Sequence, residues 1–236
     1  KLFIITAAIG FTLGIAMFAA LGFMPTFLQM ASGTSAAESG LLMIPMMAGL
    51  MLTSIVSGIW VSKSGKYKVY PIIGIIIAIA ALLAMTTLSA QTPIWLICAY
   101  LALFGAGLGF VMQIIVLVAQ NSVAADTVGT ATSTNNYFRE VGASLGTAVF
   151  GAYFTARLAE RLNDVFTGSG LDASQASDAT ATIDPQTLST LPEQVQNGIV
   201  AAYADSLAPV FWYVIPFLVL ALIFAFFLKE IPLQTE

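Results

Sequence analysis

Long segments without a single charged residue are the feature of this chain that most restricts its fold. Residues 2–37, 39–62, 69–125 and 206–228 contain no Asp, Glu, Lys or Arg. A helix needs about 20 mostly apolar residues to cross the hydrocarbon core of a bilayer. Each segment is therefore long enough for at least one membrane span, and the longest is long enough for two. The pattern predicts an all-α membrane protein with several transmembrane helices.

The composition agrees with this class and excludes several kinds of site. Charged residues make up 8% of the chain and hydrophobic residues 58%, whereas a soluble domain is usually about 25% charged. Histidine is absent, which excludes His-based metal sites and proton relays. The one cysteine, Cys98, lies in an apolar run, and no nucleophile–base or metal-ligand cluster is visible. We therefore expect no enzyme, no cofactor, no metal site and no nucleic-acid partner.

The apolar segments divide into six predicted spans joined by polar loops. A lysine-rich loop, Ser62–Lys68, follows the second span. The stretch Asn163–Asp205 carries six acidic residues and no basic one, and we predict it to be an extracytoplasmic polar loop. The predicted spans are Phe3–Met30, Ala36–Val61, Val69–Leu88, Pro93–Val118, Val128–Leu162 and Ala208–Leu228.

Proline and a capping motif predict how the first two spans are shaped at their outer ends. Pro25 and Pro45 each lie inside a predicted span, where proline removes a backbone donor and kinks the helix. Ser35 with Glu38 three residues later forms a capping box at the start of the second span. We interpret Glu38 as a helix cap rather than a proton carrier.

The fifth predicted span contains a charged pair, Arg139 and Glu140. An Arg near the middle of a bilayer costs roughly 2.5–3.5 kcal/mol on insertion scales, so it normally faces a bundle interior or a wet cavity. At helical spacing, Asn135, Arg139, Gly142 and Gly146 fall on one face. Gly142 and Gly146 also form a G-x-x-x-G pattern that permits close helix packing. Alternatively, Arg139 snorkels to the cytoplasmic interface and only anchors the helix.

A weak internal symmetry divides the six spans into two triplets. The third span of each triplet is apolar on all sides, which is typical of a helix facing lipid. The first two spans of each triplet contain the glycines, glutamines, prolines and the charged pair. Because three is odd, the two triplets have opposite orientations, which predicts two inverted three-helix repeats.

The distribution of Lys and Arg predicts the orientation. With six spans, both ends share one side with the Ser62–Lys68 loop, and Arg157 and Arg161 lie on the other. The positive-inside rule then places both termini of this segment in the cytoplasm and the acidic loop outside the cell membrane. The basic residues on the predicted cytoplasmic side are Lys1, Lys63, Lys66, Lys68 and Lys229.

Several motifs are similar to those of a known family. They lie in Phe23–Gly49, Gly107–Gln113, Val128–Gly151 and Leu228–Gln234, in an order and at a spacing that fit. On these residues the chain resembles the C-terminal half of a major facilitator superfamily transporter, in the fourteen-helix drug:proton antiporter branch of multidrug exporters. The resemblance implies that residues 1–236 form the C-terminal six-helix transmembrane bundle of a larger transporter. It also implies partners: the lipid bilayer, the N-terminal transporter half, a hydrophobic small molecule and protons.

The family's mechanism indicates candidate cavity residues. Two halves enclose a midplane site and expose it to each side alternately. Polar groups are costly inside a membrane and usually serve a function. The polar candidates for lining the substrate cavity are therefore Gln29, Gln113, Asn135 and Arg139. Aromatic and methionine side chains can repack around different drugs, or can simply pack between helices or face lipid. Of this kind we select Phe18 and Met47, and for close packing we select Gly109 in the fourth span.

One loop departs from the family pattern. Gly58–Lys68 resembles a degenerate G-x-x-x-D-x-x-G-[RK] motif with Ser62 where the acid belongs, which puts gating control by this loop in doubt. The family's proton-coupling carboxylates are expected mostly in the N-terminal half. Alternatives to drug export in the inner (plasma) membrane are export of lipids and a six-helix membrane scaffold that transports nothing. An ion channel is disfavoured because no ring of like charge or filter loop is visible.

Overall fold

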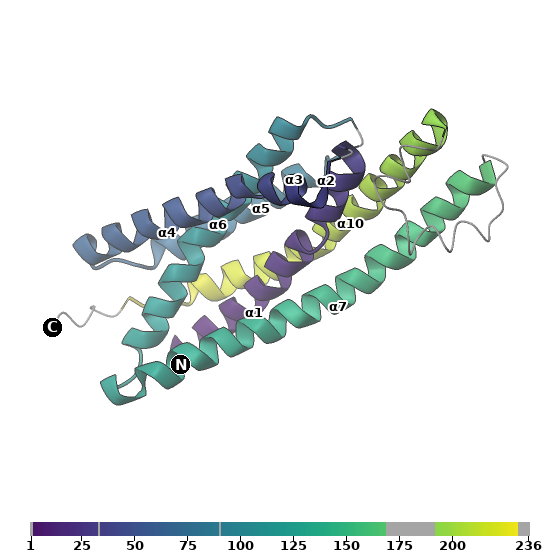
Figure 1. Cartoon of the computed structure of the whole chain (residues 1–236). Coiled ribbons are helices and arrows are strands. Elements are labelled where there is room, and N and C mark those ends of the chain that lie inside the picture. Colours follow the sequence, from purple (N-terminus) through teal and green to yellow (C-terminus); the bar gives the residue numbers. More distant parts are fainter. Residues whose placement is uncertain (1, 33, 90, 169–191, 231–236) are drawn as a thin grey trace.

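The computed structural model describes residues 2–32, 34–89, 91–168 and 192–230, and this part of the chain contains helices and no strands. Six membrane segments follow one another in the predicted order (Figure 1). The helices are α1 (Leu2–Leu21), α2 (Met24–Ser32), α3 (Ala36–Leu41), α4 (Ile44–Ser64), α5 (Val69–Met85), α6 (Ile94–Asn121), the 3₁₀ turn η1 (Ala125–Thr127), α7 (Val128–Gly168) and α10 (Glu193–Phe226).

The first two membrane segments are each broken into two helices, and proline explains both breaks. We predicted a kink at each proline within a single span, and the structure shows a break in the helix before each one. A helix needs the N–H of residue i to reach the carbonyl of residue i−4, and proline has no N–H. α1 ends at Leu21, four residues before Pro25, and α3 ends at Leu41, four residues before Pro45. Each proline instead lies in the first turn of the next helix, where its missing N–H costs nothing.

The N-terminal end of the second segment carries the predicted capping box. The Glu38 backbone N–H donates to Ser35 Oγ at 3.3 Å, and the Ser35 N–H donates to Glu38 Oε2 at 2.9 Å. The prediction that Glu38 caps α3 is confirmed. Its carboxylate is therefore engaged at a helix start and is not directed into the bundle.

The last helical pair is longer than predicted, which corrects the boundaries of the acidic loop. α7 continues to Gly168, and α10 begins at Glu193 rather than Ala208. This polar region nevertheless contains an apolar stripe at helical spacing: Val195, Ile199 and Tyr203 are buried and lie four residues apart. The ring of Tyr203 lies 6.2 Å from that of Phe154 on α7. Of the predicted loop, residues 169–191 lie outside the described residues.

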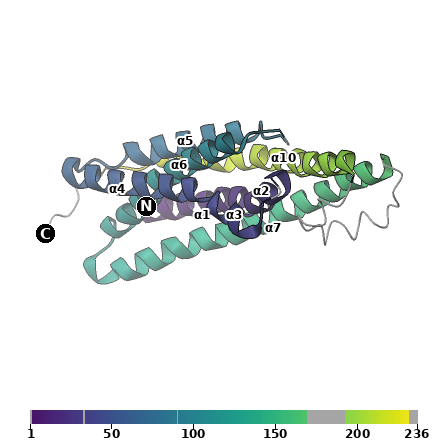
Figure 2. The same ribbon diagram turned by 45° about the horizontal axis from the view of Figure 1, so that its top comes forward.

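The packing of the helices follows the predicted inverted repeat. The most extensive contacts join α1 to α7 and α4 to α6, so the first helix of each triplet packs on the second helix of the other triplet. The third helices, α5 and α10, pack on each other and on α6 and α1, respectively (Figures 1 and 2). The all-α fold with two inverted three-helix repeats is confirmed. By length and apolarity alone, three helical stretches of the described chain qualify as spans: Ala36–Ser64, Ile94–Asn121 and Glu193–Phe226.

Glycines set the distance between the helices at the α1–α7 crossing. A Cβ added at Gly142 would collide with the carbonyl oxygen of Phe11, and one at Gly146 would lie 2.6 Å from the carbonyl oxygen of Ile15. In the reverse direction, a Cβ at Gly14 would collide with the carbonyl oxygen of Arg139. The two backbones therefore touch, as the G-x-x-x-G spacing suggests.

The α4–α6 crossing is built in the same way. A Cβ at Gly105 would collide with the carbonyl oxygen of Met46, and one at Gly109 would collide with that of Leu50. Thr53 Oγ1 adds a hydrogen bond to the Ala106 carbonyl oxygen at 2.8 Å. At each crossing, therefore, a helix of one repeat is in backbone contact with a helix of the other repeat.

Candidate substrate cavity

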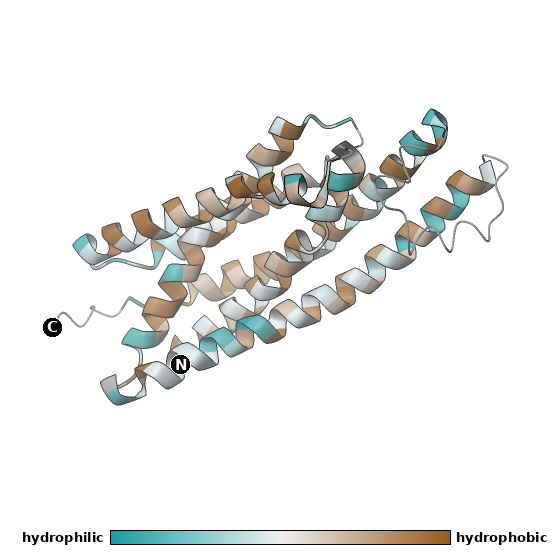
Figure 3. Cartoon of the chain, in the orientation of Figure 1, coloured by the Kyte–Doolittle hydropathy of each residue, from teal (hydrophilic) through white to brown (hydrophobic). Residues whose placement is uncertain are grey.

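The N-terminal half of α7 brings polar groups into an otherwise apolar bundle (Figure 3). Asn135 is 1% exposed, and its side-chain nitrogen has no hydrogen-bond partner among the described residues. Gly10 on α1 makes room for it, because a Cβ there would lie 3.3 Å from Asn135 Oδ1. A buried amide with free donors is costly unless it is satisfied by a partner. Asn135 is therefore the most deeply placed candidate for polar recognition on this face.

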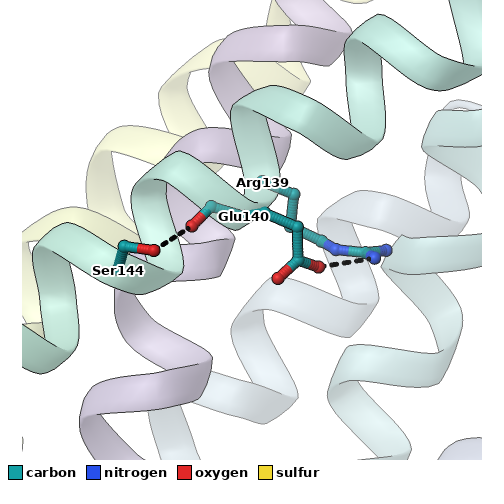
Figure 4. Close-up of polar contacts among 3 residues, drawn as sticks. All are labelled: Arg139, Glu140 and Ser144. Carbon is teal, nitrogen blue, oxygen red and sulfur yellow. Dashed lines mark hydrogen bonds and ion pairs between the residues drawn. The ribbon is translucent and has the colours of Figure 1, made fainter.

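The charged pair lies one helical turn further along α7. Arg139 Nη2 and Glu140 Oε1 are 3.1 Å apart, and the side chains are 20% and 57% exposed, respectively. Figure 4 shows both side chains extending from α7 away from the purple α1 ribbon. Arg139 Nε is buried without a hydrogen-bond partner in the described part of the chain. The guanidinium consequently keeps donor capacity beyond its bond to Glu140.

A hollow of about 360 Å³ adjoins this pair. Glu140, Ser144 and Thr147 of α7 line it, and Phe18 of α1 closes one side. The Ser144 hydroxyl donates to the Glu140 carbonyl oxygen at 3.0 Å, which leaves the carboxylate free of that hydroxyl. Of the predicted cavity residues, only Phe18 lines this hollow, where it lies with Glu140 of the charged pair; Arg139 is not among the lining residues. An aromatic wall beside a carboxylate suits a ligand that is both apolar and cationic.

Gln113 lies in a separate hollow on the α4–α6 pair. This hollow measures about 500 Å³ and is also lined by Ser54, Ser62 and Lys63. The other two predicted residues line neither hollow: Met47 is 49% exposed on α4, and Gln29 is half-buried on α2. Phe18, Asn135 and Arg139 are on α1 and α7, Gln113 and Met47 are on α6 and α4, and Gln29 is on α2. The predicted set therefore does not form one cluster within this chain.

Sequence reasoning missed an apolar hollow of about 400 Å³ between α1 and α7. Its walls include Phe3, Phe11, Phe138 and Val141. Of the aromatic and methionine side chains we selected Phe18 and Met47, and neither lines this hollow. The signal that was available is position: Phe138 and Val141 flank the Arg139–Glu140 pair.

An all-helical bundle of two inverted triplets, with polar groups on its inner helices, defines a multi-pass membrane transporter rather than an enzyme. The comparison with known proteins agrees. The profile of the Major Facilitator Superfamily matches residues 1–147, and the chain belongs to this family.

Its relatives include a protein named as a multidrug transporter. The chain is 39% identical over 231 residues to the uncharacterized MFS-type transporter Rv1877 of Mycobacterium tuberculosis, covering 98% of this chain and 33% of that protein. It is 32% identical over 250 residues to the multidrug transporter protein MdtP of Bacillus subtilis, covering 97% and 46%. It is also 34% identical over 159 residues to a tetracycline resistance determinant of Streptomyces rimosus, covering 67% and 46%.

A solved structure confirms the fold. The crystal structure of a bacterial homologue of the human lysosomal transporter Spinster, in an inward-facing and unoccupied conformation, superposes with a TM-score of 0.68 at 17% identity. The match covers 96% of this chain and 47% of that one. The chain thus spans between a third and about half of the length of these relatives.

Proposed function

We propose that this chain forms one half of a transporter that exports hydrophobic drugs, or related small molecules, in exchange for protons. The observation that carries the proposal is the Arg139–Glu140 pair on a hollow of the bundle, in a chain related to a multidrug transporter along nearly all its length. A charged pair inside a membrane is costly and normally marks a pathway for substrate or ions. An inert scaffold has no need of it.

The proposed mechanism is alternating access. A second six-helix half faces α1, α4, α6 and α7, and the two halves rock about a site near the midplane. The apolar hollow at Phe11 and Phe138 accommodates the body of a hydrophobic substrate, and the hollow at Glu140 accommodates a polar or cationic group. The backbone contacts at the two glycine crossings keep this half rigid while it rocks.

In this proposal, Arg139 holds the negative charge of Glu140 in place, and the proton-carrying carboxylates belong to the other half. Because the pair is self-neutralising, it can remain in the low-dielectric cavity through the whole cycle. Substrate and protons then compete for the carboxylates of the other half. Arg139 contributes to the electrostatic potential of the cavity in which this competition takes place.

Efflux from cells tests the function. Cells expressing the transporter with both halves should accumulate less of a fluorescent lipophilic cation than control cells, and a protonophore should abolish the difference. The 236-residue segment expressed alone should give no efflux, because its cavity face lacks the second half. Efflux that continues unchanged after the proton gradient collapses would contradict proton coupling, and absence of efflux for any lipophilic compound would contradict drug export.

We propose further that the protein lies in the plasma membrane with the α7–α10 extension outside. A cysteine at exposed Asn197, in a Cys98→Ser background, should react in intact cells with an impermeant thiol reagent. The matched cysteine at exposed Lys66, in the loop between α4 and α5, should react only after lysis. The opposite labelling pattern would reverse the orientation.

A further inference from the structure

The surface of α10 contains a feature that transport does not use. One stripe of this helix is exposed along its length, at positions spaced as a single helical face. In its inner part the stripe is entirely apolar, which is the character of a surface in contact with lipid. The residues of this apolar stripe are Trp212, Pro216, Val219, Leu220, Ile223 and Phe227.

A polar hollow lies at the outer end of the apolar stripe. It measures about 560 Å³. Arg157 and Arg161 of α7 line one side, and Asp205, Trp212 and Tyr213 of α10 line the other. The hollow therefore combines two cations, one anion and two amphipathic aromatic rings directly above a lipid-facing surface.

The depth of this hollow corresponds to the membrane interface. Thr86, at the C-terminal cap of α5, also lines the hollow. α5 has 17 residues and begins after Lys68, so it rises roughly 25 Å. That is close to the thickness of the hydrocarbon core, about 30 Å. The hollow thus lies at the interface opposite the lysine-rich loop, where Trp and Tyr rings are enriched.

The guanidinium of Arg157 has hydrogen-bond donors that are not used by other described residues. Its Nη1 lies 3.7 Å from Glu160 Oε2, which is an ion pair longer than a hydrogen bond. Its Nε is buried and has no hydrogen-bond partner among the described residues. A guanidinium with an unused donor at a membrane interface matches the oxygens of a phosphate, which it can bind in a bidentate manner.

We propose that this hollow binds the headgroup of a phospholipid that carries both a phosphate and an ammonium group, such as phosphatidylethanolamine. Arg157 and Arg161 contact the phosphate, and Asp205 contacts the ammonium group with Trp212 beside it. The acyl chains lie along the apolar stripe of α10. Asp205 is the reason for choosing a zwitterionic lipid, because its carboxylate repels a purely anionic headgroup. The proposal is independent of what the transporter exports.

Lipid binding to the purified full-length transporter in detergent tests this site by native mass spectrometry. Phosphatidylethanolamine should bind to the wild-type protein, and Arg157→Gln/Arg161→Gln should weaken that binding about tenfold, as expected when charged hydrogen bonds are lost. Lys66→Gln/Lys68→Gln removes the same charge from the opposite side of the membrane and should leave the binding unchanged. Equal loss in both double variants would overturn the proposal, because it would reveal a general charge effect.

A second variant separates the headgroup classes. Asp205→Asn should weaken phosphatidylethanolamine binding and leave phosphatidylglycerol binding unchanged or stronger. If the arginine variant does not fold, Asp205→Asn decides the matter, and unchanged binding of phosphatidylethanolamine in that variant would refute the site. Displacement of the lipid by millimolar inorganic phosphate would show a site for free anions and would also refute the proposal.

Discussion

Replacing Arg139 with alanine is expected to reduce export at least about tenfold while leaving the amount of transporter in the membrane unchanged. Membrane insertion should not suffer, because removing a charge from a span makes insertion easier. Transport should suffer, because Glu140 loses the guanidinium that lies 3.1 Å from its carboxylate. The carboxylate then has lost its counter-ion, which changes the electrostatic field that substrate and protons encounter.

Companion variants identify the role of the pair. Arg139→Lys keeps the charge and loses the planar fork, so partial export in this variant would indicate a point-charge role. Arg139→Ala/Glu140→Ala removes both charges. If the role of Arg139 is to neutralise Glu140, this double variant should export faster than Arg139→Ala. Initial efflux rates, normalised to the transporter in the membrane, provide the measurement. An alanine variant that exports at the wild-type rate would mean that Arg139 is only an interfacial anchor.

Replacing Gly142 with alanine is expected to destabilise the whole bundle, by about 1–3 kcal/mol, a typical cost of overpacking. The added methyl group would collide with the carbonyl oxygen of Phe11, so α1 and α7 must move apart along their entire crossing. The thermal unfolding midpoint of the purified transporter in detergent should fall, and the yield of folded protein should fall with it.

Gly129 provides a control in the same helix. Nothing lies within 4 Å of a Cβ added there, and alanine is the better helix former by about 1 kcal/mol. Gly129→Ala should therefore leave stability unchanged or slightly raise it. Gly109→Ala should behave like Gly142→Ala, because its Cβ would collide with Leu50 of α4. Equal unfolding midpoints for Gly142→Ala and Gly129→Ala would show that the crossing is loosely packed.

The features that follow from local rules could be predicted from the sequence alone. The charge-free segments define the class and five of the six membrane segments, since span length depends only on the bilayer. The remaining segment, which contains Arg139 and Glu140, was predicted from its apolar flanks. The capping box at Ser35 and Glu38 involves atoms three residues apart, so no tertiary contact is needed to form it. The breaks near Pro25 and Pro45 also arise from the missing N–H of each proline, where we predicted kinks within a span.

Features that depend on distant partners appeared only in the tertiary structure. Residues 193–205 look like a loop because they are polar, and they are helical because Val195, Ile199 and Tyr203 find an apolar partner in α7. The spacing of Gly105 and Gly109 indicates that another helix can pack closely against α6, but it does not indicate that this helix is α4. Likewise, no rule of sequence spacing separates Gln113 from Phe18 and Glu140, which line different hollows.

The hollow between α7 and α10 also separates what the sequence predicts from what tertiary packing decides. Trp212 and Tyr213 can be read from the sequence as interfacial aromatic residues, and Arg157 and Arg161 as basic residues near a span end. That they line one hollow depends on how α7 and α10 lie beside each other. The sequence determines where each helix meets the membrane, because hydropathy acts on each segment separately. Only tertiary packing decides which side chains share a site, because that requires contact between segments distant in the chain.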